Sequence, residues 1–568
     1  MRFFKTLILI SIFLSFSAIT FSQEKINTPS SESSSSISNA TSNHFEISKN
    51  LDIYVSLLKE LNTYYVDGID PSALVKASIK AMLKSLDPYT VYYSESDAED
   101  FRFLTTGSYG GIGSMISNTG DYVIFSEPYK GFPASKAGIL AGDIILEIDG
   151  KDAKGLSNDE ISELLKGQPG TEVNVLIKRP FLEKEIIKIL TREKIKIENV
   201  PYSGMLSNNV GYISLAGFKR DAGADVKNAF NKLLKENKQM SGLILDLRGN
   251  PGGLLIESVR IAALFVDKGE LIVSTKGKVD AWNKTYKTHN APVSKDIPLV
   301  VLINGRSASA SEIVAGSLQD LDRAIIIGER SFGKGLVQTQ RSLSYNTHLK
   351  VTTAKYYIPS GRCIQELDYS HKDEKGKAKK VPDSLVTKYQ TRNGRAVIDA
   401  KGISPDIEVE SEKYPEIIKT LIIERVIFDF ATKYRHSHDS IDLPKNFTLS
   451  EKEYQEFVDF AKDKEIKYKT STEKSLKKLK KNAKKEKYFD LISNEYELII
   501  EKLEEHKSDE LNHYKNRIKA LVENEIVGRY YFQEGKIINR LETDKKIAEA
   551  LKLFSDLDKY NSILNPEK

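Results

Sequence analysis

A serine at the expected start of a helix gives the first chemical signal in this chain. In INGRSASASEIVAGSLQDL (303–321), small residues lie between an apolar strand and an apolar helix, and Ser309 stands where the helix begins. Glu312 follows three residues later, a spacing typical of a capping box that needs no catalysis. A serine there is also exposed, close to free backbone N–H groups and in a positive dipole field. These features suit a nucleophile whose attack creates an oxyanion.

A nucleophilic serine needs a base, and Lys334 is the natural candidate. It lies between Gly333 and Gly335 beside Phe332. Burial can lower a lysine pKa from about 10.4 to roughly 7–8. If the chain continues extended, Gln338 projects to the same side, where its carbonyl could orient the amine without adding charge.

The histidines offer no local alternative to this lysine. None of them sits in a motif beside a candidate nucleophile, so a Ser-His-Asp triad has no local support, and only a distant histidine stays open. The eight histidines are His44, His289, His348, His371, His436, His438, His506 and His513.

Two further segments bear on the same chemistry. In LDLRGNPGG (245–253), a strand runs into a glycine turn. Gly252 and Gly253 could donate an N–H group to an oxyanion, with the Ala310 N–H as second donor, although glycine turns after strands are common. Asp320 lies 11 residues after Ser309 on the expected helix, about 16 Å away, so we expect it to support the structure.

A glycine-rich stretch lies earlier in the chain, just before an expected strand. It comprises Gly110, Gly111, Ile112 and Gly113. Successive N–H groups that point the same way there would cradle a carboxylate. An ordinary glycine-rich turn explains the stretch equally well.

Composition and periodicity divide the 568 residues into segments of different character. The expected segments are a signal peptide (1–22), a Ser-rich linker (23–45), a helical element (46–100), a compact β-rich module (101–188), an α/β domain of alternating strands and helices (189–410) and a charged helical region (411–568). Within the α/β domain, we expect helices over 222–236, 254–266 and 309–321.

The amino-terminal residues predict export. Arg2 and Lys5 precede an apolar run from Leu7 to Phe21, and small residues follow at the expected cleavage position. An uncleaved membrane anchor is the alternative, because a run of this length is marginal for spanning.

The single cysteine, Cys363, cannot form an intramolecular disulfide, and we expect it to pack as a small apolar residue.

The net charge of the chain excludes few classes of function by itself. The net charge of +5 is small for this length and does not argue for nucleic acid. The basic stretch KSLKKLKKNAKKEKYF (474–489) predicts a solvated helix face, with contact to an anionic peptide or membrane surface as the lesser alternative.

Taken together, the motifs resemble the C-terminal processing peptidases, also called tail-specific proteases. Each piece is weak alone, but the ordered set, over residues 50 to 410, is highly specific. The matching segments are LKSLDPYTVYYS (83–94), YGGIGSMI (109–116), FPASKAGILAGDIILEIDG (132–150), LILDLRGNPGGLL (243–255), SASASEIVAGSLQD (307–320), GERSFGKGLVQ (328–338), YYIPSGRCIQ (356–365) and GISPDIEV (402–409).

The resemblance implies a fold and a role for each domain and for three residues. It implies a crotonase-like (ClpP/crotonase-type) α/β protease core, into which a PDZ domain that binds substrate C-termini is inserted. By motif position, Ser309 maps to the family nucleophile, Lys334 to its base and Gln338 to the residue that orients the lysine. Cys363 departs from the pattern, since a serine is more usual there.

Two functions of different class follow. The first is a serine endopeptidase of the periplasm or cell envelope that forms an acyl-enzyme and acts on proteins with flexible apolar C-termini. The second is a PDZ-containing binding or scaffold protein without protease activity. Ser309, Lys334 and Gln338 all stand in matching contexts, which favours the enzyme. No metal or other cofactor is expected. A homodimer through the N-terminal helices and an adaptor on the C-terminal helices are expected partners, and nucleic acid is not.

Overall fold

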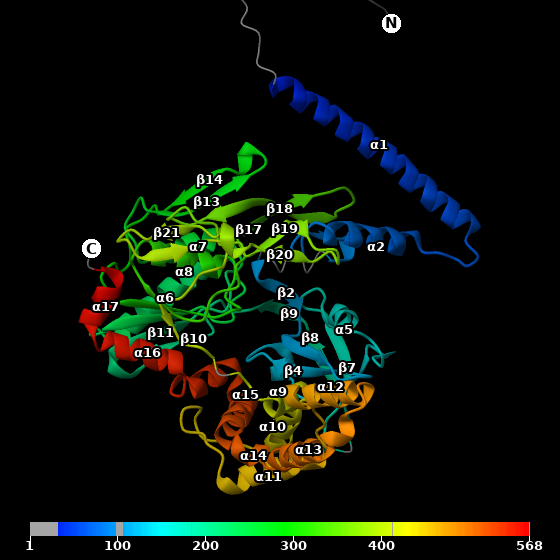
Figure 1. Cartoon of the computed structure of the whole chain (residues 1–568), viewed down its shortest axis with the longest axis vertical. Coiled ribbons are helices and arrows are strands. Elements are labelled where there is room, and N and C mark those ends of the chain that lie inside the picture. Colours follow the sequence, from blue (N-terminus) through cyan, green and yellow to red (C-terminus); the bar gives the residue numbers. More distant parts are fainter. Residues whose placement is uncertain (1–31, 98–105, 183, 412, 567–568) are drawn as a thin grey trace, which may run out of the picture. The chain divides into compact units, whose positions relative to one another are not determined.

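The structure, a computed structural model, describes residues 32–97, 106–182, 184–411 and 413–566 (Figure 1). The expected signal peptide lies outside these ranges. The chain forms two compact units, Met1–Ala81 and Met82–Lys568. Within the described ranges, no helix is both long enough and apolar enough to cross a membrane.

Two helices dominate the amino-terminal unit. They are α1 (Glu32–Tyr64) and α2 (Pro71–Lys84). The hydroxyl groups of Tyr54 and Ser78 join them, 2.5 Å apart. Helix α1 begins inside the segment expected to be a linker, 23–45. Its serines are only moderately poor helix formers, and no proline or glycine follows Pro29 until the helix has ended.

The β-rich module is built around one antiparallel sheet with a short helix across it. Alternate residues of its strands, such as Val173, Val175 and Ile177, are buried together with Ile161 and Leu165 of the helix. The strand order is β3-β4-β5-β7-β8, so β3 is an edge strand. The elements are β3 (Ser114–Asn118), β4 (Val123–Pro128), β5 (Ile144–Ile148), β7 (Glu172–Lys178), β8 (Glu185–Thr191) and α5 (Asn158–Leu165).

A six-stranded sheet forms the centre of the α/β domain. Its order is β10-β11-β12-β15-β16-β23, with every neighbouring pair parallel except β10 and β11. The strands are β10 (Tyr202–Met205), β11 (Val210–Ser214), β12 (Gly242–Asp246), β15 (Leu299–Ile303), β16 (Ile325–Gly328) and β23 (Ile407–Glu408). Strands β11, β12, β15 and β16 are almost wholly apolar. This composition is typical of strands whose sheet is covered by other elements on both faces.

Three helices pack on one face of this sheet, close to where the sequence predicts them. They are α6 (Ala222–Glu236), α7 (Leu255–Ala262) and α8 (Ala310–Asp320). Their apolar side chains share one core with Leu243, Leu245 and Val301 of the strands. Helix α8 is buried along its whole length, which fixes the direction of its first turn.

A second, antiparallel sheet lies against the same core. Its strands run in the order β1-β18-β13-β14, and β17 also pairs with β18. They are β1 (Val91–Tyr93), β13 (Leu271–Gly277), β14 (Lys284–Lys287), β17 (Leu336–Ser342) and β18 (His348–Tyr357). Strands β1 and β17 both pair with β18, so the segment before Val91 and the strand that follows Lys334 flank the same strand.

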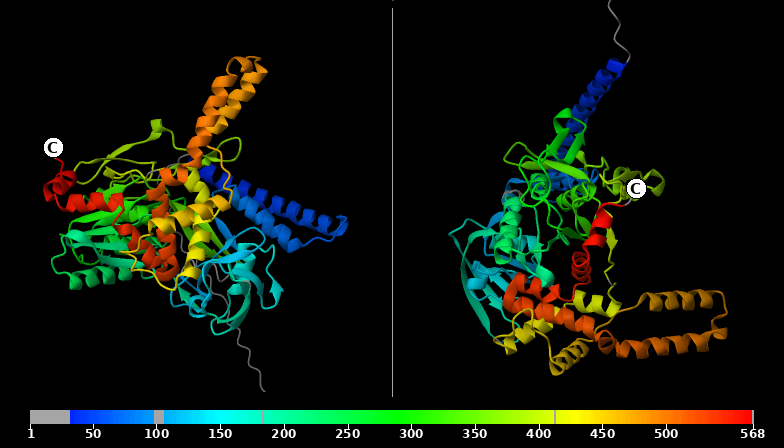
Figure 2. Two further views of the ribbon diagram at one scale, coloured as in Figure 1. Left: turned by 90° about the horizontal axis from the view of Figure 1, so that it is seen from below. Right: turned by 90° about the vertical axis from the view of Figure 1, so that its left-hand side faces the viewer.

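The region after residue 411 is helical, as predicted. Helices α9 (Glu416–Ile423), α10 (Val426–Ser437), α11 (Glu451–Asp463) and α15 (Lys515–Leu541) share one apolar core. Helices α12 (Ser471–Lys485) and α13 (Ser493–Ser508) form a hairpin that extends away from that core (Figure 2).

The last two helices belong to the α/β domain instead. Helices α16 (Lys545–Phe554) and α17 (Leu557–Leu564) cover the second face of the central sheet (Figure 1). Phe554 and Tyr560 are buried there against Ile244 and Val300. The carboxyl-terminal segment therefore completes the core of the domain that carries Ser309.

Candidate active site

Ser309 stands at the N-terminus of α8 in a strained backbone conformation. Its φ is 55° and its ψ is −112°, outside the regions that residues with a side chain normally occupy. Strain of this kind persists only where the surroundings fix it, and it is common at active sites. The Tyr356 hydroxyl donates to the Ser309 carbonyl oxygen at 3.2 Å and helps to fix it.

Glu312 ties the serine to the loop that carries the lysine. Its Oε2 accepts from the backbone N–H groups of Ser309 (2.7 Å) and Lys334 (2.9 Å). Its Oε1 accepts from the Ser331 hydroxyl (2.5 Å) and the Gly333 N–H (2.7 Å). Burial raises the pKa of this carboxyl, and the four donors oppose that shift. The residue read as a helix cap therefore also brings the candidate nucleophile and base together.

Lys334 points into a largely desolvated site. Its Nζ donates to Gln338 Oε1 at 2.8 Å and lies 4.2 Å from the centre of the Tyr89 ring. Burial and then the positive charge of Lys350 lower the pKa of the lysine to about 8, against the opposing charges of Asp87 and Glu312. Among the described residues, no hydrogen bond joins this amine to the Ser309 hydroxyl, so proton transfer between them requires a movement of one of the two side chains.

Further residues that the sequence did not single out hold this arrangement. Gln338 Nε2 donates to Thr352 Oγ1 (3.2 Å), and Thr90 Oγ1 lies 3.4 Å from the same atom. Asp87 accepts from the backbone and hydroxyl of Thr90. The motif DPYT (87–90) was visible in the sequence, but nothing in it said that Tyr89 would cover Lys334.

The glycines after β12 approach the serine closely. A side chain on Gly252 would lie 2.6 Å from the Ala308 carbonyl oxygen and 2.9 Å from Ser309 Cβ, so only glycine fits. The Gly252 N–H, however, donates to Asn250 Oδ1 at 2.9 Å. Of the three N–H groups expected to face an oxyanion, those of Gly253 and Ala310 are the better candidates.

Asp320 lies at the far end of α8 from Ser309. Its carboxylate binds the buried Arg362 at 2.8 Å and accepts from the Ser360 N–H at 2.9 Å. These contacts attach the end of α8 to the segment after β18. Asp320 thus makes structural contacts at a distance from the chemistry.

Cys363 lies in the segment after β18, next to Arg362. It packs beside Gly335, and burial raises the pKa of its thiol. In the parts of the chain that the structure describes, no group of three or more His, Cys, Asp or Glu side chains could hold a metal ion.

The glycine-rich stretch of the β-rich module divides into two parts. Gly110 and Gly111 lie in β2 (Ser108–Gly111), which pairs with β9 (Glu193–Lys196). Ile112 and Gly113 form the turn into the edge strand β3, and Gly113 has a φ of 72°. A peptide that added to β3 would meet this turn at one end.

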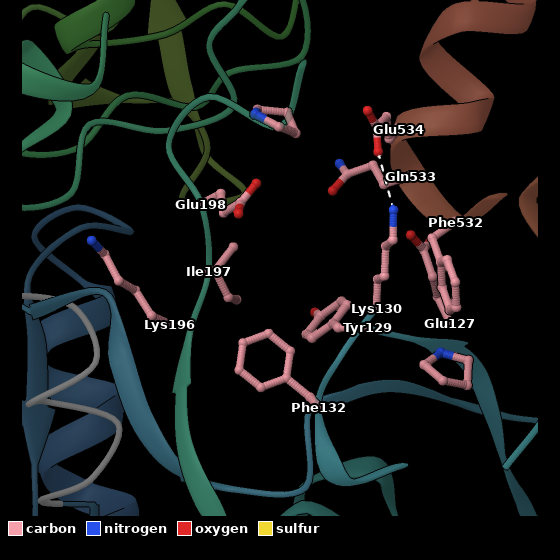
Figure 3. A pocket seen from close by; sticks show the side chains of 12 residues that line it. Glu127, Tyr129, Lys130, Phe132, Lys196, Ile197, Glu198, Phe532, Gln533 and Glu534 are labelled. Carbon is pink, nitrogen blue, oxygen red and sulfur yellow. Dashed lines mark hydrogen bonds and ion pairs between the residues drawn. The ribbon is translucent and has the colours of Figure 1, made fainter. Parts of the chain in front are cut away.

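A hollow of about 290 Å³ lies behind that turn, between the module and α15 (Figure 3). Phe132, which packs against Gly113, lines it with Tyr129 and Ile197, and Phe532 faces them from α15. An exposed ion pair between Lys130 and Glu534 (3.5 Å) bridges its edge.

Comparison with known proteins identifies the parts of the chain. The model of peptidase family S41 matches residues 209–370, a PDZ domain model matches 124–179, and the model of the C-terminal helical domain of probable PDZ-proteases matches 417–554.

Individual proteins are similar to this chain over much of its length. A carboxy-terminal-processing protease of Bartonella bacilliformis is 38% identical over 57% of this chain and 75% of its own length. A probable CtpA-like serine protease of Staphylococcus aureus is 32% identical over 65% of this chain and 66% of its own. A photosystem II D1 C-terminal processing protease, of known structure, is 31% identical with a TM-score of 0.35, over 65% of this chain and 89% of its own.

The crotonase-like core, the inserted PDZ domain and the helical domain together define a serine peptidase of family S41. The chain belongs to the carboxy-terminal-processing proteases of that family.

Proposed function

We propose that this protease is an exported endopeptidase, with Ser309 as nucleophile and Lys334 as base, that cleaves envelope proteins after binding their C-terminal tails. The observation that carries the catalytic part is the shared carboxylate of Glu312. One of its oxygens accepts from the backbone of both Ser309 and Lys334, so the two residues are held side by side.

The mechanism needs a neutral amine near the serine. Burial lowers the pKa of Lys334 to about 8, and Gln338 orients the amine without a negative charge that would raise that pKa again. Lys334 takes the Ser309 proton as Oγ attacks the peptide carbonyl, and the Gly253 and Ala310 N–H groups stabilise the oxyanion. The amine then protonates the leaving nitrogen, and water hydrolyses the acyl-enzyme.

Substrate choice belongs to the PDZ domain. PDZ domains bind an extended peptide as an added strand at a sheet edge, and β3 is such an edge. The turn at Ile112 and Gly113, which leads from β2 into β3, supports a site for the C-terminal carboxylate of that peptide. Flexible, apolar C-termini are therefore the expected substrates.

Export and assembly are the parts of the proposal that rest on sequence features. The basic and apolar residues before Gln23 support passage to the periplasm or cell envelope, with membrane attachment if they stay uncleaved. Exposed apolar side chains along α1, among them Phe45, Leu51 and Leu57, support a homodimer. The α12–α13 hairpin offers a charged surface for an adaptor protein.

The test uses the mature chain and a loosely folded protein, supplied with either an apolar or a doubly acidic C-terminal tail. We expect the wild type to degrade the apolar-tailed form faster, and Ser309→Ala and Lys334→Ala to bind it without cleaving it. A wild type that binds tails but cleaves none of several substrates would make the chain a binding or scaffold protein.

A further inference from the structure

The helical region leaves the α/β domain and returns to it at one place. Ser411, at the exit, donates its N–H to Glu329 Oε1 at 2.8 Å. Lys546, at the return, donates from Nζ to the same carboxylate oxygen (2.9 Å) and to Ser411 Oγ (2.7 Å). Glu329 follows β16 and stands five residues before Lys334. The two ends of the helical region are therefore fastened to the loop that carries the base.

A second attachment reaches the loop that approaches Ser309. Asp544, which precedes α16, accepts from Arg248 Nη1 at 2.6 Å. The other nitrogens of Arg248 bind Asp246 at the end of β12, and Asp246 also accepts from the Tyr212 hydroxyl. The Arg248 and Asp544 side chains are only 19% and 20% exposed, so the pair is screened less than a surface pair.

The position of Arg248 can affect the catalytic loops, because hydrogen bonds join the segment that follows it to the residues around Ser309. The Gly249 N–H donates to Asn304 Oδ1 (3.0 Å), and the Asn250 carbonyl accepts from Ala308 N (3.0 Å) and Ser311 Oγ (2.9 Å). These bonds connect the loop after β12 to the residues just before and just after Ser309. The close contact at Gly252 leaves little room for adjustment.

We propose that the first turn of α16 is a positioning element of the active site. Asp544 acts through Arg248 on the loop that ends in Gly252 and Gly253, and Lys546 acts through Glu329 on the loop that bears Lys334. Neither residue touches substrate. The attachment of the helical region would then set how well the catalytic groups are aligned. The inference rests on the proposed Ser309 and Lys334 mechanism and adds residues to it.

The test must separate positioning from capping, because Asp544 also caps α16 through the N–H groups of Lys546 and Ile547. Asp544→Ser keeps a good cap and removes the carboxylate. We expect kcat for a peptide substrate to fall by about tenfold to a hundredfold with KM within about twofold, since a small misplacement of catalytic groups has effects of this size. Asp544→Glu should recover most of the loss.

Asp556→Ser is the matched control. Asp556 caps α17 through the Lys559 N–H at 3.0 Å, away from both loops. We expect this variant to keep the wild-type kcat. A second measurement is the affinity for a peptide aldehyde, whose adduct with the serine places an oxyanion in the site. We expect the affinity for the aldehyde to decrease together with kcat in Asp544→Ser, and to stay at the wild-type value in Asp556→Ser.

Two results would overturn the inference. One is an unchanged kcat and aldehyde affinity in Asp544→Ser, and the other is an equal loss in Asp556→Ser, which would indicate general loosening. Either result leaves wild-type cleavage and its dependence on Ser309 intact. Failure of the proposed function would instead appear as a wild type without that dependence.

Discussion

The surroundings of Lys334, the proposed base, favour the neutral form of a side chain that is normally charged. Its amine lies between the Gln338 carbonyl and the face of Tyr89, where water is largely excluded. With a pKa of about 8, roughly one amine in ten is neutral at pH 7. Catalysis is therefore expected to increase with pH through that value.

The charge of Lys350 gives the first prediction. Lys350 is half-buried on β18, on the same strand face as Thr352, and it disfavours the protonated form of Lys334. Lys350→Met removes this repulsion while Asp87 and Glu312 still favour the charged amine, so the pKa of Lys334 should increase. We expect the rising limb of kcat/KM to move to higher pH. Lys355→Met removes an exposed lysine of the same strand whose charge does not act on Lys334, so it should leave the limb in place. An unmoved limb in Lys350→Met would contradict the account.

Glu312 gives the second prediction. A glutamine can accept at only one of its two polar ends, and its NH2 group would face N–H donors, so Glu312→Gln leaves buried donors unsatisfied. Each such donor costs about 1–3 kcal/mol. We expect the free energy of unfolding to fall by at least ~2 kcal/mol in urea titrations and kcat to fall by about a hundredfold or more.

A buried glutamate elsewhere provides the control for that change. Glu257 accepts from the Gly223 N–H and pairs with Arg260, away from Ser309. Glu257→Gln should lower stability but not kcat measured on the folded fraction. Equal losses of kcat in both variants would show that Glu312 matters only for stability.

At the residue scale, the sequence predicted what depends on local spacing. The bond from Lys334 to Gln338 follows from four residues of extended chain, and the Ser309 position follows from the start of a helix. Tyr89 and Thr352 could not be predicted, because strand pairing between distant segments brings them to the lysine. The hydrogen bond from the Gly333 N–H to Glu312 could not be predicted for the same reason, because it also depends on strand pairing between distant segments.

Among the elements, α15 has an unusual break at Phe532. Its φ of 57° and ψ of −153° are not helical, although helix continues on both sides. The sequence RYYFQEG (529–535) contains no proline, and its only glycine comes three residues later. The break directs Phe532 into the hollow beside the PDZ domain (Figure 3).

That conformation gives the third prediction. Phe532→Ala and Phe532→Gly both remove the ring, but only glycine adopts this φ and ψ without strain worth about 1–3 kcal/mol. We expect the glycine variant to be the more stable in chemical denaturation. In a regular helix the order would be reversed, because alanine is favoured there by about 1 kcal/mol. A more stable alanine variant would therefore mean that the helix is continuous in solution.

Helical periodicity predicted the helices of this region but not their partners. An amphipathic helix shows which face is apolar, and not what covers that face. The Phe532 break carries no sequence signal, because the usual causes of a kink, proline and paired small residues, are absent from the position itself.

At the scale of the molecule, the carboxyl-terminal helices stabilise the catalytic domain. Phe554 and Tyr560 cover the face of the central sheet opposite α6, α7 and α8. The Tyr560 hydroxyl also bonds the backbone N–H and carbonyl of Leu299. The sequence predicted a separate charged extension after residue 411, whereas its last segment is part of the protease core.

The fourth prediction follows from this packing. Phe554 is 6% exposed and lies against Gly242, where no side chain would fit. Phe554→Ala should cost about 3–5 kcal/mol of unfolding free energy. Leu557→Ala, at a position that is 47% exposed, should cost much less. Similar midpoints in thermal unfolding for the two variants would contradict the packing described here.

The pH dependence of kcat/KM for a peptide substrate tests the central claim most directly, because it reports the pKa of the base in the free enzyme. With Ser309 and Lys334 as the catalytic pair, the wild-type profile rises through about pH 8, and Ser309→Ala and Lys334→Ala are each at least about a hundredfold slower at every pH. A limb near 6.5, the ordinary pKa of histidine, with activity retained in Lys334→Ala would contradict the claim and identify a histidine as the base.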